Sequence, residues 1–274
     1  MKKAKYFVAL GFIVLGIILC VVGGIMYYTT DYKDYYEVTD FSQVYSFSDT
    51  VSDVIVDCPV GTVKIVEGNE LSVEAEKVIA DSFNCDFSDG VLSVKYENRK
   101  LSKFINVGFM TPDLSKSIIT ITIPSGSESI DSLKITNGVG EMTVSGISAK
   151  NALFENGVGE FRISGCTFYQ KFKLNSGVGS FRAEDCTLAN PTIDNGIGES
   201  RFINCSVSGD LDISNGIGEI DLEINGDMSD YSFDVDNGIG EVKINGSSYG
   251  SVHSKGPYTV EIDNGIGSIS IDFK

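Results

Sequence analysis

Five glutamates recur at one position of a short repeated motif, and they are the side chains best placed to do chemistry. Neighbouring carboxylates at strand spacing could hold a cation such as Ca²⁺. The spacing differs, however, from the nine-residue repeat of calcium β-rolls, and bases stand two residues further on in several copies. We therefore favour a surface charge lattice that offsets itself and keep Ca²⁺ binding as the alternative. The acids are Glu141, Glu160, Glu199, Glu219 and Glu241, and the bases are Arg162, Arg182, Arg201 and Lys243.

Catalytic groups are scarce in this chain. A Ser-His-Asp arrangement would have to use His253, which lies in the longest interval between repeats and reads as a solvated loop residue. No C-x-x-C pair occurs among the six cysteines, so a zinc or redox motif is not expected. The sequence thus predicts no enzyme, no cofactor and no metal site.

The composition favours strands and an acidic surface. The chain has 274 residues, including 30 Gly and no Trp, and its formal net charge is −17. Such a surface repels nucleic acid and anionic lipid, so no nucleic-acid partner is expected. Cations or basic peptides are compatible with it.

A motif of the form Asn-Gly-Val/Ile-Gly-Glu recurs seven times with small variations. Its first glycines are spaced by 19, 20, 19, 20, 22 and 27 residues, and strict two-residue alternation of apolar side chains flanks each copy. A period near twenty with alternating strands predicts a single-stranded β-solenoid, all-β, right-handed and with about three faces. The first glycines are Gly138, Gly157, Gly177, Gly196, Gly216, Gly238 and Gly265.

Alternation also predicts which side chains fill the solenoid. The motif asparagines should point inward and form a hydrogen-bonded ladder, and the Val or Ile two residues later, such as Val178, should fill the corner. A second column, Ile147, Cys166, Cys186 and Cys205, should stack inside adjacent rungs as small apolar residues, with a strained disulfide as the alternative. The predicted ladder consists of Asn137, Asn156, Asn195, Asn215, Asn237 and Asn264.

The N-terminus predicts a membrane anchor. Lys2, Lys3 and Lys5 precede an uncharged run from Tyr6 to Tyr28, which is long enough to span a hydrocarbon core. The basic flank should stay in the cytoplasm and place residues 31–274 outside, on the extracellular side of the cell membrane. A cleaved signal peptide and a lipoprotein anchored at Cys20 are the alternatives.

Four parts follow from these patterns. Residues 1–30 are the anchor with its short cytoplasmic tail, 31–50 a juxtamembrane stalk, 51–124 irregular early rungs, and 125–274 the regular repeats. The loop at 99–116 is basic and apolar, so it could dock a partner or serve as a flap packed on its own domain. The candidate partner-binding residues in it are Arg99, Lys100, Lys103, Phe104 and Phe109.

The chain resembles the bacterial "putative adhesin" β-solenoid domains of unknown function. The resemblance rests on Pro-Val-Gly-Thr-Val-Lys-Ile ending at Ile65, Gly-Val-Leu-Ser-Val ending at Val94, Ile-Thr-Ile-Thr-Ile-Pro ending at Pro124, and the Leu-x-Ile-x-Asn-Gly-x-Gly rungs. It covers about residues 50–274 and implies the solenoid fold, a place on the outer face of the membrane and, for some members, a link to envelope stress. No catalytic residues come with it.

These observations favour a non-enzymatic surface module that binds or scaffolds, as an adhesin or an envelope-stress sensor. Two other classes stay open. A β-helix enzyme acting on acidic polysaccharides would need a basic or metal-loaded cleft. A self-assembling β-helix scaffold would need free end rungs, and the irregular early strands are expected to block one end.

Overall fold

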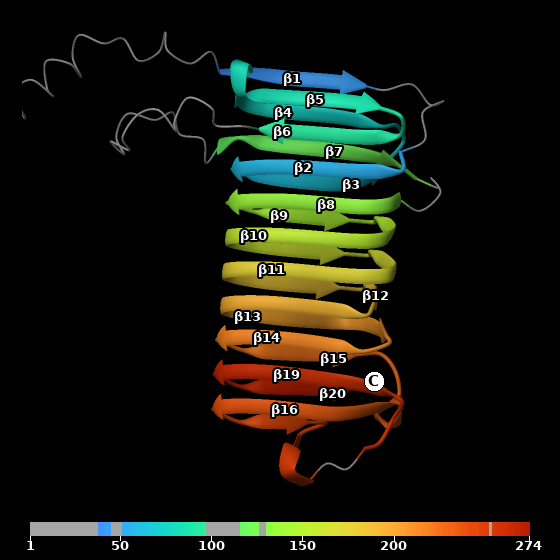
Figure 1. The fold of residues 1–274 in the computed structure, drawn as a ribbon, viewed down its shortest axis with the longest axis vertical. Coiled ribbons are helices and arrows are strands. Elements are labelled where there is room, and N and C mark those ends of the chain that lie inside the picture. The colour runs from blue at the N-terminus through green and yellow to red at the C-terminus, as the bar shows by residue number, and fades with distance from the viewer. Residues whose placement is uncertain (1–37, 45–50, 97–115, 126–129, 252–253) are drawn as a thin grey trace, which may run out of the picture. The chain divides into compact units, whose positions relative to one another are not determined.

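The computed structural model describes residues 38–44, 51–96, 116–125, 130–251 and 254–274 (Figure 1). These residues are all-β, with a few short 3-10 turns and no α-helix. None of the helices in the described ranges is long and apolar enough to cross a membrane. The predicted anchor at residues 6–28 lies outside the described residues.

The middle repeats form a stack of rungs in which each repeat pairs in parallel with the next. Asn137 lies beside Asn156, Asn156 beside Ser176 and Ser176 beside Asn195, so the motif keeps its register from rung to rung. A middle rung has three strand segments, because short pairings such as Thr187 with Ser206 form a third side. The strands are β8 (Ile130–Val139), β9 (Met142–Ser145), β10 (Ser148–Ser164), β11 (Thr167–Glu184), β12 (Thr187–Ala189) and β13 (Pro191–Ser208).

The C-terminal rungs do not stack in sequence order. Strands β19 (Tyr258–Ile266) and β20 (Ile269–Phe273) insert between β14 (Leu211–Ile217) with β15 (Ile220–Ile224) and β16 (Tyr231–Ile239) with β17 (Val242–Ile244). The last repeat in sequence is therefore second to last in space (Figure 1). The long intervals of 22 and 27 residues lie in the segments that lead from β14 to β16 and from β16 back to β19.

The N-terminal strands correct two expectations. Residues 38–44, predicted as stalk, form strand β1, which pairs antiparallel with β4 (Ser72–Ile79). The region 51–124 is only partly made of rungs. Strands β2 (Asp53–Val60) and β3 (Thr62–Gly68) stack in parallel on β8 and β9, and on β6 (Val91–Tyr96) and β7 (Ile118–Pro124). In contrast, β4 and β5 (Phe83–Ser88) pair antiparallel with β7 and β6.

Phenylalanines fill the middle of the stack. The rings of Phe161 and Phe181 stack at a centroid distance of 5.3 Å, and Phe172 lies 5.8 Å from Phe181. These side chains are at most 1% exposed. Aromatic rows of this kind add contact energy beyond the area they bury, so the rows of the core link successive rungs.

A tyrosine closes the free edge at the C-terminal end. Among the described residues β16 pairs with β19 on one side, and on the other the Tyr249 hydroxyl accepts from the Val235 N–H at 3.3 Å and donates to the Phe233 carbonyl at 3.0 Å. A short strand, β18 (Ser247–Ser248), turns back antiparallel on β17. An edge strand whose backbone groups are occupied is a poor template for another strand.

The expected burial of the cysteine column is confirmed. Ile147, Cys166, Cys186 and Cys205 are at most 2% exposed, and none of these cysteines is in a disulfide. Cys58 is also fully buried and occupies the rung position directly above Asn137. Burial raises the pKa of the Cys58 thiol to about 12. The hydrogen bond with Cys186, together with burial, raises the pKa of Cys205.

Glycine is required at the corner of each rung for a steric reason. Gly179 has φ +148°, and a Cβ on it would lie 1.8 Å from the carbonyl oxygen of Gly159 in the preceding rung. A Cβ on Gly159 would meet Gly140 at the same distance. No side chain fits between backbones that approach this closely.

We expect Gly179→Ala to lower the free energy of unfolding by at least about 3 kcal/mol, because both the backbone conformation and the space exclude a Cβ. Gly165→Ala is the matched control. Gly165 has φ +60°, but the nearest atom to its Cβ position is 4.0 Å away, so only the conformational cost of about 1–2 kcal/mol applies. Urea unfolding of both variants measures the difference, and equal losses would refute the contact argument.

Alkylation of the native chain should separate the cysteines by burial. Cys58, Cys166, Cys186 and Cys205 are buried while Cys85 is half-buried, and an alkylating reagent needs an accessible thiolate. We expect Cys85 to react first and the four others to react only after unfolding. Peptide-resolved mass spectrometry of the labelled protein gives the order, and rapid labelling of Cys166 in the native state would contradict this register.

Candidate functional site

The motif asparagines lie at the inside of the corner and bond in two ways. In the C-terminal rungs they form a ladder in which Asn195 Nδ2 donates to Asn215 Oδ1 at 3.1 Å and Asn215 Nδ2 donates to Asn264 Oδ1 at 2.9 Å. Asn264 Nδ2 continues it to Asn237 Oδ1 at 3.0 Å. Ser176 replaces the amide one rung earlier, so the ladder starts at Asn195, whose Oδ1 has no hydrogen-bond partner among the described residues.

In the earlier rungs the asparagine amide binds the corner itself. Asn156 Nδ2 donates to the Gly159 carbonyl at 3.2 Å, and Asn137 Nδ2 lies 3.5 Å from the Glu141 carbonyl. The amide thus occupies the inner space of the turn and donates to a corner carbonyl, and the Glu141 carbonyl also accepts from the Val63 N–H at 2.9 Å. Little room remains inside the corner for a second side chain.

The prediction that Val178 and its equivalents fill the corner is wrong. Val178 is 46% exposed, and every Val or Ile at this motif position from Val139 onward is between 46% and 67% exposed. The asparagine already occupies the corner, and the following Gly-x-Gly turn reverses the phase of the alternation. An aspartate at position 178 would therefore point to solvent, and the large cost expected from burying its charge does not apply.

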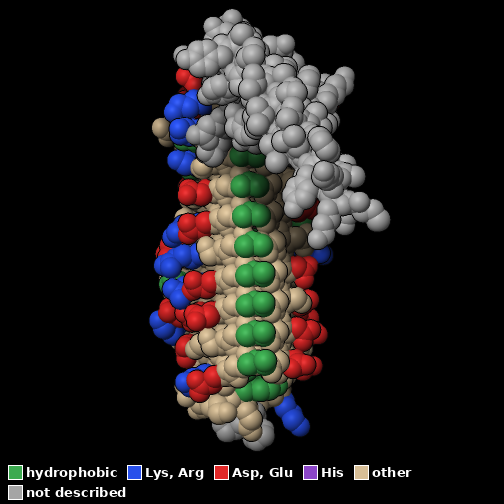
Figure 2. All heavy atoms as spheres, turned by 90° about the vertical axis from the view of Figure 1, so that its left-hand side faces the viewer, with side chains coloured by type: hydrophobic (Ala, Val, Ile, Leu, Met, Phe, Trp, Pro, Cys, Tyr) green, Lys and Arg blue, Asp and Glu red, His purple; other side chains and the backbone are tan. Residues whose placement is uncertain are grey.

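The outward Val and Ile side chains form one continuous row, which we call the apolar ridge. Figure 2 shows it as a line of hydrophobic side chains down the middle of one edge of the stack. Because the rungs are in register, successive members are separated by one strand spacing of about 4.8 Å. The ridge consists of Val139, Val158, Val178, Ile197, Ile217, Ile266 and Ile239 in spatial order.

A shallow groove of about 980 Å³ runs beside the ridge along five rungs. Its floor is the column of first glycines, Gly177, Gly196, Gly216, Gly265 and Gly238, with the asparagine ladder beneath. Its outer wall includes Asp194, Asp263 and Asp236. The groove exists because the floor residues have no side chains while both neighbouring rows do.

The wall of the groove belongs to an acidic face on β13, β14, β19 and β16. Register places Asp194, Ser214, Asp263 and Asp236 in one row and Thr192, Asp212, Glu261 and Asp234 in the next. All six acids of this face are exposed, and the one base within 4 Å of any of them in the described chain is Lys173, 3.9 Å from Asp194. We define the acidic face as Asp194, Asp212, Asp234, Asp236, Glu261 and Asp263.

Crowding on this face alters the titration of Asp212. Partial desolvation, followed by the charges of Asp194 and Asp263, raises the pKa of its carboxyl, and Lys173 partly opposes the shift. Like charges opposite each other on neighbouring strands repel. Five of the six acids of the acidic face therefore have no base within 4 Å in the described chain, and they stand beside an apolar surface.

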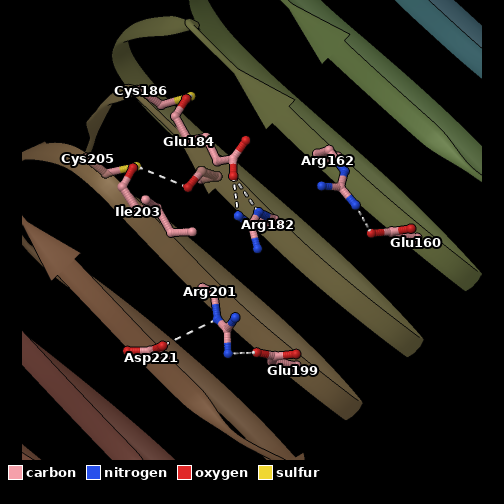
Figure 3. A network of polar contacts seen from close by, with 11 residues as sticks. Glu160, Arg162, Arg182, Glu184, Cys186, Glu199, Arg201, Ile203, Cys205 and Asp221 are labelled. Carbon is pink, nitrogen blue, oxygen red and sulfur yellow. Dashed lines mark hydrogen bonds and ion pairs between the residues drawn. The ribbon is translucent and has the colours of Figure 1, made fainter.

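The opposite side of the ridge is different, because its charges are paired (Figure 3). Arg162 pairs with Glu160, Arg182 with Glu184, and Arg201 with both Glu199 and Asp221, the last at 3.3 Å. Lys243 lies 2.8 Å from Glu241. These ion pairs form the kind of surface charge lattice that the sequence predicted. In the described ranges, no group of three or more acidic, His or Cys side chains is arranged to hold a metal ion.

The other predicted residues are distributed as follows. Glu141 and Glu219 are exposed on the same side as the charge lattice. Arg99, Lys100, Lys103, Phe104 and Phe109 lie outside the described residues, as does His253. Their roles stay predictions.

Neither the ridge nor the acidic face was predicted from the sequence, although each leaves a signal in it. Strict alternation places two residues on the same side of a strand only when they are an even number of positions apart. Ile135 and Met142 both point inward although they are seven residues apart, so the alternation must break between them. The acids at 194, 236 and 263 directly precede a motif asparagine. The pairing of rungs across the insertion, which brings residues 194–236 and 263 together, is not visible in the sequence.

Comparison with solved structures finds several similar β-rich proteins. A "putative cell adhesion protein" from Clostridium sporogenes is 16% identical, with a TM-score of 0.45, over 87% of this chain and 100% of its own. A "putative lipid binding protein" from Parabacteroides distasonis is 13% identical, with a TM-score of 0.41, over 87% of this chain and 98% of its own. Among curated proteins no sequence matches the chain.

Comparison with protein families gives a match over the region that contains most of the repeats. One family model, Toastrack DUF4097, matches residues 56–265, which begin within β2 and end within β19. The match covers well over half of the chain. The protein is therefore a member of the Toastrack DUF4097 family.

Proposed function

We propose that this protein is a non-enzymatic binding module displayed on the outer surface of the cell membrane. The observation that carries the proposal is the exposed apolar ridge on a regular stack of strands, beside an acidic face on which Lys173 is the one close base in the described chain. Contiguous apolar surface on a soluble domain commonly marks an interaction site. Adhesion and envelope sensing are both roles that such a surface could serve.

The anchor is the second part of the proposal. Residues 6–28 carry no charge, and the three lysines before them favour a cytoplasmic N-terminus. Residues 31–274 would then lie outside the cell as a β-solenoid ectodomain. The acidic surface would keep this ectodomain from lying on anionic headgroups, because like charges repel within a Debye length. The basic loop at 99–116 is a second candidate contact in this arrangement.

Self-assembly into filaments is less well supported by the geometry. A filament of rungs needs a free edge at each end of the stack. At the C-terminal end the Tyr249 hydroxyl occupies backbone groups of β16, and β18 covers β17. The contacts of the stack thus favour a single finite module over an open-ended polymer.

Surface display can be tested by protease treatment of intact cells that express the full-length chain. We expect peptides from residues 38–274 to be released, while the peptide from Lys2 to Tyr28 stays in the membrane fraction and a cytoplasmic marker protein stays intact. Uncleaved ectodomain in intact cells, or a mature N-terminus near Thr29, would refute the proposed display. Mass spectrometry of both fractions distinguishes these outcomes.

A further inference from the structure

The apolar ridge offers a ligand more than scattered surface residues do. Its members are β-branched and regularly spaced, and on the last five rungs they stand directly beside the groove. Five rungs at about 4.8 Å give a strip about 19 Å long. Covering Val178, Ile197, Ile217, Ile266 and Ile239 would remove a continuous aliphatic surface from water, which is the usual source of affinity at an interface centre.

The charges on either side of the ridge indicate what could cover it. On one side, Arg182, Arg201 and Lys243 neutralise neighbouring acids. On the groove side, by contrast, the acidic face has Lys173 as its one close base within the described chain. The asymmetry is local to the groove and is not a property of the acidic protein as a whole, because both sides belong to the same rungs.

We propose that the groove and the ridge bind a basic segment of a partner polypeptide, which lies across the last five rungs. This proposal rests on the surface-binding function proposed above and adds the chemistry of the partner. Aliphatic side chains and lysine or arginine stems of the segment would contact the ridge. Their cationic ends would lie over Asp194, Asp263 and Asp236.

Lysine and arginine suit this surface because each combines an apolar stem with a charged end. A ligand side chain of this kind must extend from the ridge to the acidic face across the floor of the groove. Asp194 and Ile197 are three residues apart on one strand, and Gly196 between them forms the floor. A second copy of the chain would bring acidic faces together and is disfavoured, and anionic lipid is repelled for the same reason. A divalent cation alone would leave the ridge uncovered.

The test measures binding of short synthetic peptides to the full-length chain in neutral detergent micelles. The probe is a fluorescent peptide of four Lys-Val repeats, which is about 26 Å long when extended and so exceeds the strip. Peptides of four Lys-Ser repeats and four Glu-Val repeats test the apolar and the charged contribution separately. We expect the Lys-Val peptide to bind most tightly and the Glu-Val peptide to bind least.

Variants of the chain locate the contact. Asp236→Asn with Asp263→Asn should weaken binding of the Lys-Val peptide by about tenfold, since close charge pairs at an interface carry large coupling. Ile197→Ser with Ile217→Ser should weaken it by about fivefold at an unchanged Tm, because these side chains are exposed in the free protein. Glu74→Gln with Glu76→Gln is the matched control. It makes the same change in net charge on exposed residues of β4, at the other end of the stack, and should leave affinity unchanged.

Equal losses from the two charge-changing pairs would mean non-specific attraction to an acidic protein and would overturn the proposal. So would calcium binding that the Asp236→Asn with Asp263→Asn pair abolishes and that the peptide does not compete with. Failure of the Lys-Val peptide to bind also overturns the inference. The proposed surface function is judged independently by protease treatment, so the two failures can be told apart.

Discussion

The structure depends on one close backbone contact, repeated at the corner of each motif repeat. A Cβ on Gly198 would lie 1.6 Å from the carbonyl of Gly179, and the same contact recurs from Gly140 to Gly267. The pairing of neighbouring rungs cannot shift by one residue, because a residue with a side chain would then stand where the two backbones come this close. The corner therefore sets the register of the stack, and rungs of unequal length must adjust elsewhere.

The adjustment is found at the far corner of the rungs. Asn151 pairs with Lys171 while Ala149 pairs with Phe168, so β11 carries one additional residue there and the pairing shifts locally. Asn190 and Asn204, with φ of 44° and 51°, turn neighbouring corners without glycine. The glycine corner thus keeps a fixed register, while the far corner accepts one additional residue, so the repeats can be spaced by either 19 or 20 residues.

This division explains how much of the fold could be predicted. The two-residue alternation that flanks each motif copy predicted strands with one buried side, and Ile135, Met142 and Val144 are buried as it requires. The repeat predicted the stacking of Cys166, Cys186 and Cys205. Alternation failed at Val178 because strand β11 bends at the Gly177–Gly179 corner, and the two-residue rule assumes a backbone that stays extended. The insertion of β19 and the recruitment of β1 depend on pairings between distant segments, for which a local pattern carries no information.

The candidate site follows from the same contact, because register converts single residues into rows. Once Gly196, Gly216 and Gly265 are aligned, Ile197, Ile217 and Ile266 must align as well, and so must Asp194 and Asp263. A row of exposed isoleucines is unfavourable in water, and a row of acids repels itself. Neither row belongs to the core of the rungs, which is built from buried residues such as Ile213, Leu222 and Ile262. Exposed rows that lie outside the core are better explained by a contact with another molecule than by packing within this one.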